Sequence, residues 1–124
     1  MTDRDPLTEL IIGAAMEVRR RTGCGLLENA YHTFLCIELR KRNLEFASQQ
    51  MLPVDYDGHR VELAYRPDLI VDNRVIVELK TVTAISPAHE AQILTYLRLS
   101  GIKVGLLINF HAVPFKSGIR RFVV

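Results

Sequence analysis

The stretch RPDLIVDNRVIVELK, residues 66–80, decides the fold of this chain. Two apolar runs, residues 69–71 and 75–77, flank the polar segment 72–74, a pattern typical of two short strands joined by a turn. Three charged residues, Asp68, Glu78 and Lys80, stand at or within these runs. Burial of charge among branched aliphatic side chains is costly unless the charges are paired or bind a metal. Their position therefore indicates more than a simple core.

The register of this strand pair depends on the length of its turn. A three-residue turn, residues 72–74, places Asp68 opposite Glu78, and Lys80 shares their face because side chains alternate along a strand. Directly opposed residues have Cβ atoms roughly 4.5–5.5 Å apart, where like charges repel. A two-residue turn would place the two acids on opposite faces. We expect the three-residue turn, which makes the other face entirely apolar, with Leu69, Val71, Val75, Val77 and Leu79.

Two carboxylates at this separation need a raised pKa or a cation. Hard divalent ions such as Mg²⁺ often take only one or two carboxylates, and water and phosphate fill their other positions. A structural interpretation is equally compatible with the spacing: Glu78 pairs with Lys80 at the sheet edge, and Asp68 is solvated.

The flanking sequence predicts helices and short strands. Asp5-Pro6 is typical of a helix start, and Gly23 of a helix end. The remaining expected elements are a helix over 26–42, an alternating segment over 44–65 with a hairpin turn at Asp57-Gly58, a helix over 88–100 after Ser86-Pro87, and strands within 103–110 and 118–124. We expect three or four strands before the third helix. The order predicts an α/β protein of the α+β type, a mixed sheet flanked by helices.

The chain has 124 residues and a formal net charge of +2, which neither indicates nor excludes a nucleic-acid partner. Its length suits one domain, residues 1–124. No apolar run is long enough to cross a membrane, and residues 1–10 lack the pattern of a signal peptide. Cys24 and Cys36 lack metal-type spacing, so we expect reduced thiols in a cytoplasmic protein.

The segment RPDLIVDNRVIVELK resembles the PD-(D/E)XK nuclease signature, with Pro67-Asp68 as its first half and Glu78-Leu79-Lys80 as its second. GLLENAY, residues 25–31, fits the Gly-x-x-Glu-x-x-Tyr motif that names the GxxExxY protein family. IIGAAMEVRRRTGCGLLENAY and HEAQILTYLRLSGIKVGLLINF are similar to that family's pattern, so the resemblance covers residues 7–124. Cys24 departs from it, because the family often has proline in this turn, which affects the stiffness of the turn more than the chemistry.

The resemblance implies a restriction-endonuclease-like core and hydrolysis of phosphodiester bonds in DNA, or in RNA. It implies that Asp68 and Glu78 are ligands of Mg²⁺ or Mn²⁺ and that Lys80 positions or activates the attacking water. Glu28 corresponds to the acidic residue that many members supply from the preceding helix, so the implied catalytic residues are Glu28, Asp68, Glu78 and Lys80.

Three further residues are predicted to contact substrate. Gln92 and Tyr96 are four apart and share a helical face, and Gln-x-x-x-Tyr resembles the third motif of RecB-type nucleases. An amphipathic helix with a half-buried tyrosine is the structural alternative. Tyr31 shares a face with Glu28, although this face could simply be solvated. His89 could bind a metal, assist proton transfer or cap its helix.

The competing hypothesis to a nuclease is a module with a nuclease-like fold that binds nucleic acid or a partner without cleavage. Partner expectations are nucleic acid, no membrane, and either a homodimer or a larger nuclease or helicase subunit. Three basic groups, residues 19–21, 40–42 and 120–121, could contact phosphate, although solvated helix ends and strand edges also explain them.

Overall fold

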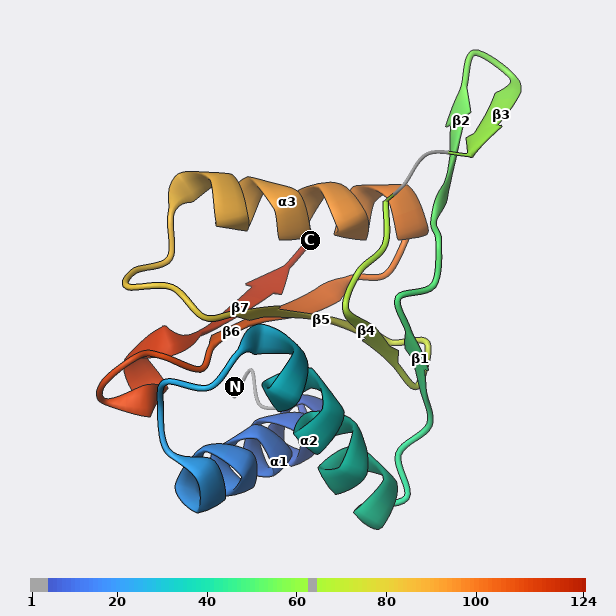
Figure 1. Cartoon of the computed structure of the whole chain (residues 1–124). Coiled ribbons are helices and arrows are strands. Elements are labelled where there is room, and N and C mark those ends of the chain that lie inside the picture. The colour runs from blue at the N-terminus through green and yellow to red at the C-terminus, as the bar shows by residue number, and fades with distance from the viewer. Residues whose placement is uncertain (1–4, 63–64) are drawn as a thin grey trace.

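The computed structural model describes residues 5–62 and 65–124 (Figure 1). Its elements are, in chain order, α1 (Pro6–Thr22), α2 (Glu28–Lys41), β1 (Phe46–Ser48), β2 (Pro53–Tyr56), β3 (His59–Glu62), β4 (Leu69–Val71), β5 (Val75–Lys80), α3 (Pro87–Ser100), β6 (Val104–Asn109), the 3₁₀ helix η1 (Phe115–Gly118) and β7 (Ile119–Val123).

The main sheet of the described residues has five strands in the order β1-β4-β5-β6-β7. β5 and β6 are parallel, with α3 as the connection between them, and the other neighbours are antiparallel. α1 and α2 cover one face of the sheet and α3 covers the other (Figure 1). The predicted class, a mixed sheet flanked by helices, is confirmed.

The predicted register of the β4–β5 hairpin is confirmed. Leu69 pairs with Val77 and Val71 with Val75, so the turn has three residues. Its first two, Asp72 and Asn73, have φ values of 54° and 52°. Asp and Asn tolerate this left-handed conformation better than most residues, which explains why the chain can reverse direction here.

The two faces of the hairpin enter different cores. The apolar face, with Leu69, Val71, Val75, Val77 and Leu79, packs with buried side chains of α1 and α2. Ile70 and Ile76 on the opposite face pack with Ile93 and Leu97 of α3. Because helices cover both faces, every residue of β4 and β5 except Lys80 is buried, and the charged face of the hairpin begins only beyond Ile76.

The helix ends follow the predicted chemistry. Asp5 caps α1 by accepting a hydrogen bond from the Leu7 amide at 2.9 Å. Ser86 caps α3 in the same way by accepting from the His89 amide, and Gly101 ends that helix in the left-handed conformation that glycine adopts without strain. The observed helices therefore begin and end within two residues of the predicted bounds.

The segment between α2 and β4 differs from the prediction. It holds three short strands, β1, β2 and β3, so the described residues contain five strands before α3 instead of the expected three or four. The predicted turn at Asp57-Gly58 is confirmed, since Tyr56 pairs with His59. β2 and β3 leave the main sheet and form their own two-stranded sheet, which projects beyond α3 (Figure 1). Sequence alternation predicts a strand but not the sheet that it joins.

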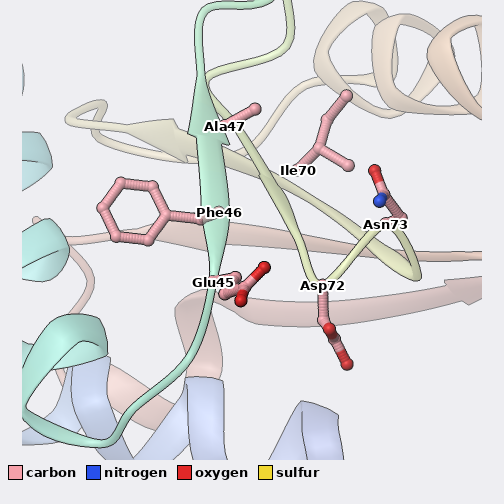
Figure 2. Close-up of a pocket in the computed structure, with 6 residues that line it drawn as sticks. All are labelled: Glu45, Phe46, Ala47, Ile70, Asp72 and Asn73. Carbon is pink, nitrogen blue, oxygen red and sulfur yellow. The ribbon is translucent and has the colours of Figure 1, made fainter.

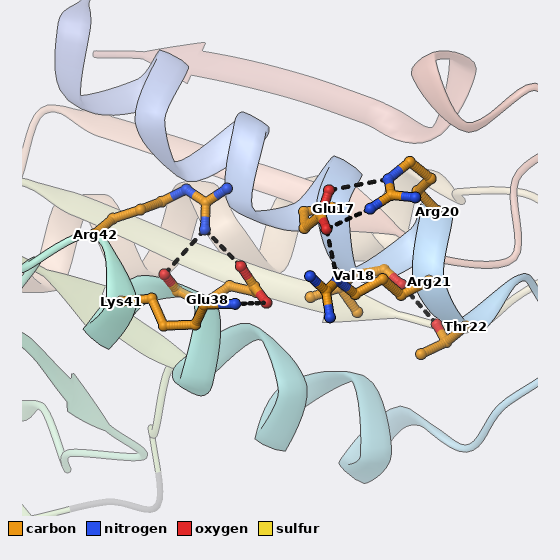
Figure 3. A network of polar contacts seen from close by, with 8 residues as sticks. All are labelled: Glu17, Val18, Arg20, Arg21, Thr22, Glu38, Lys41 and Arg42. Atoms are coloured by element: carbon orange, nitrogen blue, oxygen red, sulfur yellow. Dashed lines mark hydrogen bonds and ion pairs between the residues drawn. The ribbon is translucent and has the colours of Figure 1, made fainter.

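Many of the basic side chains are engaged within the protein itself (Figure 3). Arg20 and Arg21 pair with Glu17 on α1, and Lys41 and Arg42 pair with Glu38 on α2. Arg19 donates to the backbone oxygens of Phe110 and Ala112, the Arg40 guanidinium lies over the Phe46 ring, and Arg120 pairs with Glu90. These contacts favour the structural explanation for most of the basic groups.

We expect the Glu38 pairs to make stability depend on pH. The Arg42 and Lys41 side chains lower the pKa of Glu38 below its ordinary 4.5. A lowered folded-state pKa stabilises the fold above that ordinary value, and the stabilisation is lost as the pH falls through the lowered value. Glu38→Gln should therefore lose about 0.5–1 kcal/mol at pH 7, and the loss should shrink as the pH falls below the ordinary value and through the lowered pKa.

Urea unfolding of both proteins at a series of pH values measures this difference. The exposed Glu45 provides the control variant, Glu45→Gln, which should match the parent protein throughout. A Glu38→Gln deficit that persists unchanged in acid would contradict the assignment.

Candidate active site

The carboxylates of Asp68 and Glu78 each accept a hydrogen bond from a backbone amide on the opposite side of the hairpin. The Asp68 amide donates to Glu78 Oε1 at 2.6 Å, and the Leu79 amide donates to Asp68 Oδ2 at 2.8 Å. Both carboxylates therefore lie at the open end of the β4–β5 hairpin, where the predicted register brings them. Each accepts a backbone hydrogen bond through one oxygen, which leaves Glu78 Oε2 and Asp68 Oδ1 for another ligand.

The surroundings of both acids favour their protonated forms. Glu78 is 3% exposed, and burial, followed by the charge of Asp68, raises its pKa to about 8. Burial also raises the pKa of Asp68, against the opposing effects of the Leu79 amide, His32 and Lys80. Charged carboxylates in such surroundings are compensated by a cation or a proton. A cation that binds here would release a proton.

Glu28 brings a third carboxylate from the first residue of α2. Partial burial and, after it, the charge of Asp68 raise its pKa, whereas Lys80 lowers it. The negative charge of Glu28 is also felt at Glu78. The structure thus brings Glu28, Asp68, Glu78 and Lys80 into one electrostatic neighbourhood, although they come from three different elements.

Lys80 is joined to α3 by a short chain of side-chain hydrogen bonds. Its Nζ donates to Gln92 Oε1 at 3.1 Å, and Gln92 Nε2 donates to the Tyr96 hydroxyl at 3.3 Å. Tyr96 is buried, and its ring meets that of Tyr65 edge to face. Gln92 is exposed. The spacing of Gln92 and Tyr96 on one helical face therefore connects α3 to Lys80 through two hydrogen bonds.

His89 has a structural position. Its Nδ1 accepts from the Ser86 amide at 3.0 Å, while Ser86 Oγ accepts from the His89 amide. The side chains of these two residues close a capping box at the start of α3. Of the three predicted roles for His89, capping is the one that its contacts support.

Tyr31 lies in the core instead of facing the carboxylates. Its side chain has no exposed surface and stacks on the Phe110 ring, with centroids 4.5 Å apart. The hydroxyl donates to the Gly23 oxygen at 2.6 Å and accepts from the Leu26 amide at 3.3 Å. Tyr31 thereby holds the α1–α2 loop that delivers Glu28. A side chain with no exposed surface cannot contact a substrate, so the predicted substrate contact of Tyr31 is wrong.

Two polar residues near the carboxylates were not identified from the sequence. His32 lies one turn after Glu28 on α2, and its charge lowers the pKa of Asp68. Asn109, which is buried at the end of β6, accepts from the Val82 amide and donates to the Val82 oxygen. Asn109 thereby fixes the backbone just after Lys80. The four-residue spacing of Glu28 and His32 could have indicated His32 from the sequence. The position of Asn109 follows only from the parallel pairing of β5 with β6.

The pocket in Figure 2 lies at the opposite end of the hairpin. Its volume is about 180 Å³, and it is lined by Glu45, Phe46, Ala47, Ile70, Asp72 and Asn73. Asp72 and Asn73 belong to the hairpin turn, so the length of β4 and β5 separates this pocket from Asp68 and Glu78. The Phe46 ring points away from Ala47 and Ile70 in this view. We find no catalytic arrangement here.

The chemistry of the site fits a hard divalent ion. In residues 5–62 and 65–124, no group of three His, Cys, Asp or Glu side chains is arranged to enclose a metal. Two facing carboxylates instead suit an ion such as Mg²⁺, which keeps several waters and takes oxygen ligands from substrate phosphate. The donor set of Asp68 and Glu78 fits that ion better than it fits zinc, whose protein sites use mainly Cys and His.

Comparison with known families supports this interpretation. The family model described as the PD-(D/E)XK nuclease superfamily matches residues 5–122. The chain therefore belongs to the PD-(D/E)XK nuclease superfamily, and its mixed sheet with flanking helices is consistent with a restriction-endonuclease-like core. No curated protein and no solved structure matches the chain. None of the helices in the described residues is long and apolar enough to cross a membrane.

We expect the raised pKa of Glu78 to be visible in the stability of the metal-free protein. An acid with a pKa of about 8 when folded and 4.5 ordinarily binds more protons in the folded state between these values. Stability from this residue should therefore fall as the pH rises from about 4.5 to about 8. Glu78→Gln cannot ionise and should gain stability over the parent protein as the pH rises.

Urea unfolding in EDTA across this interval tests the sign. Glu62→Gln, at an exposed position of β3, is the control and should follow the parent protein. A Glu78→Gln variant whose relative stability declines with pH would show that Glu78 is already ionised near its ordinary pKa.

The contacts of Tyr31 predict a stability effect that is separate from the site chemistry. Tyr31→Phe keeps the ring against Phe110 but removes both hydroxyl hydrogen bonds, so we expect a loss of about 1–3 kcal/mol. Denaturant unfolding measures it, and Tyr56→Phe, which alters a 76% exposed tyrosine, should have no effect. Unchanged stability in Tyr31→Phe would mean that the hydroxyl does not hold the α1–α2 loop.

Proposed function

We propose that this protein is a divalent-metal-dependent nuclease that hydrolyses phosphodiester bonds, with DNA as the preferred substrate. The observation that carries the proposal is the pairing of Asp68 and Glu78 across the hairpin, with Lys80 on the same strand as Glu78 and held by Gln92. A site built only for stability would gain nothing from a buried Glu78 whose pKa is raised by burial and by the charge of the neighbouring Asp68.

Asp68 and Glu78 would hold Mg²⁺ or Mn²⁺ through the oxygens that the backbone amides leave open. When bound, the ion would offset charge that develops on the phosphate and favour deprotonation of the attacking water. Lys80 donates hydrogen bonds, so it can orient that water or the phosphate, and Gln92 sets the direction of its ammonium. Glu28 contributes a further carboxylate beside Asp68, where it can accept a proton or a hydrogen bond.

Within the superfamily, we propose that the chain is a member of the GxxExxY family. Gly25, Glu28 and Tyr31 form its motif, and the structure supports a physical connection between them. Tyr31 holds the loop containing Gly25, and α2 begins at Glu28 directly after that loop. A homodimer or a larger nuclease or helicase partner stays a prediction, which a mass measurement in solution would test.

Cleavage assays with the purified chain test the proposed activity. Single-stranded DNA, duplex DNA and RNA are each incubated with Mg²⁺ or Mn²⁺, and we expect cleavage that EDTA abolishes. Asp68→Asn and Lys80→Ala should each reduce the rate at least about 10²-fold, because each removes a group that acts on the reacting phosphate or water.

Matched controls separate chemistry from charge. Asp55→Asn, in the separate β2–β3 sheet, and Lys116→Ala, in η1, make the same changes at exposed positions, and both should retain full activity. Binding of Mn²⁺ by the parent protein but not by Asp68→Asn would support the ligand assignment. Nucleic-acid binding without cleavage under every metal condition would instead establish the non-cleaving module.

A further inference from the structure

A pocket of about 280 Å³ adjoins the carboxylates on the α2 side. Its lining combines Glu28, Asn29, His32 and Thr33 of α2 with Ser48, Gln49 and Asp68. Two of these residues, Glu28 and Asp68, also belong to the proposed active site. The volume lies near the lower limit of about 300 Å³ for small-ligand sites. Whatever occupies this pocket therefore lies directly beside the reacting groups.

The walls of the pocket are tied together. His32 Nε2 and Ser48 Oγ are 2.8 Å apart, which joins α2 to the end of β1. The Gln49 amide donates to the backbone carbonyl oxygen of Asp68 at 3.1 Å, so the backbone at Gln49 is anchored beside the residue that carries the carboxylate. The Gln49 side chain itself is exposed. The pocket is thus held by hydrogen bonds between its walls, while the Gln49 side chain stays accessible to a ligand.

The charge of the lining selects against phosphate. Glu28 and Asp68 are acidic, and the lining residues include no Lys or Arg. Phosphate sites normally use cationic side chains or backbone amides. The remaining groups are two carboxamides, two hydroxyls and an imidazole, all of which form hydrogen bonds. Carboxamides are the side chains that pair with nucleobase edges, and hydroxyls suit either a base or a sugar.

We propose that this pocket binds the nucleoside portion, base and sugar, of the nucleotide next to the phosphate held at Asp68 and Glu78, with Gln49 and His32 as the residues that determine which nucleoside is preferred. The assignment of the neighbouring phosphate rests on the proposed nuclease function. The pocket's affinity for a nucleoside does not depend on catalysis and can be measured without metal.

The test is an NMR titration of the isotope-labelled protein in EDTA with adenosine, with adenosine monophosphate and with inorganic phosphate. We expect adenosine to shift the amide signals of Asn29, His32 and Gln49, with a Kd on the order of 1 mM. Inorganic phosphate should leave these signals unchanged. Gln49→Gly, which keeps the backbone bond to Asp68, should weaken adenosine binding about fivefold to tenfold, whereas Gln50→Gly next to it should not.

Three results would overturn the inference: no adenosine shifts at the pocket, equal shifts with inorganic phosphate, or equal affinity in Gln49→Gly and the parent protein. The outcome is separable from that of the cleavage assay. Adenosine binding without cleavage of any substrate would contradict the proposed nuclease function and support the nucleoside-binding pocket. Cleavage by a protein whose pocket does not bind adenosine would support the nuclease function and contradict the nucleoside assignment.

Discussion

The pairing of Asp68 with Glu78 is the constraint on which the rest of the structure depends. Each carboxylate accepts a hydrogen bond from the opposite strand's backbone, so the acids help to define the register that brings them together. A shift of one residue would separate them to opposite faces and move the whole apolar set of the hairpin out of its core. The same register therefore serves both packing and chemistry.

Helices cover both faces of the sheet and so shield Glu78 from solvent. The apolar face of β4 and β5 packs under α1 and α2, and Ile70 and Ile76 pack under α3. The acids lie where this coverage ends, buried enough to raise the pKa of Glu78 yet beside an open pocket. Functional sites commonly hold such unfavourable charge because the surrounding core compensates for it.

The basic side chains of the helices and Lys80 have different kinds of hydrogen-bond partner. Arg20, Arg21, Lys41 and Arg42 neutralise Glu17 and Glu38 on the helices. Lys80 is instead directed by an uncharged partner, Gln92, and its charge acts on three nearby acids. A neutral partner fixes the direction of the ammonium without neutralising its charge, which suits the role proposed for Lys80.

The sequence by itself determined the caps of α1 and α3, and it determined that Asp68 faces Glu78 if the turn has three residues, because capping and alternation are local rules. The three-residue turn itself is an expectation, and the pairing of β4 with β5 confirms it. The sequence also indicated that Gln92 and Tyr96 share a face. Only the tertiary structure decided that this face meets Lys80, that Tyr31 turns inward onto Phe110, and that His32, Ser48 and Gln49 form a pocket beside Asp68. Those outcomes depend on how helices far apart in the chain pack on one sheet, and local spacing carries no information about that packing.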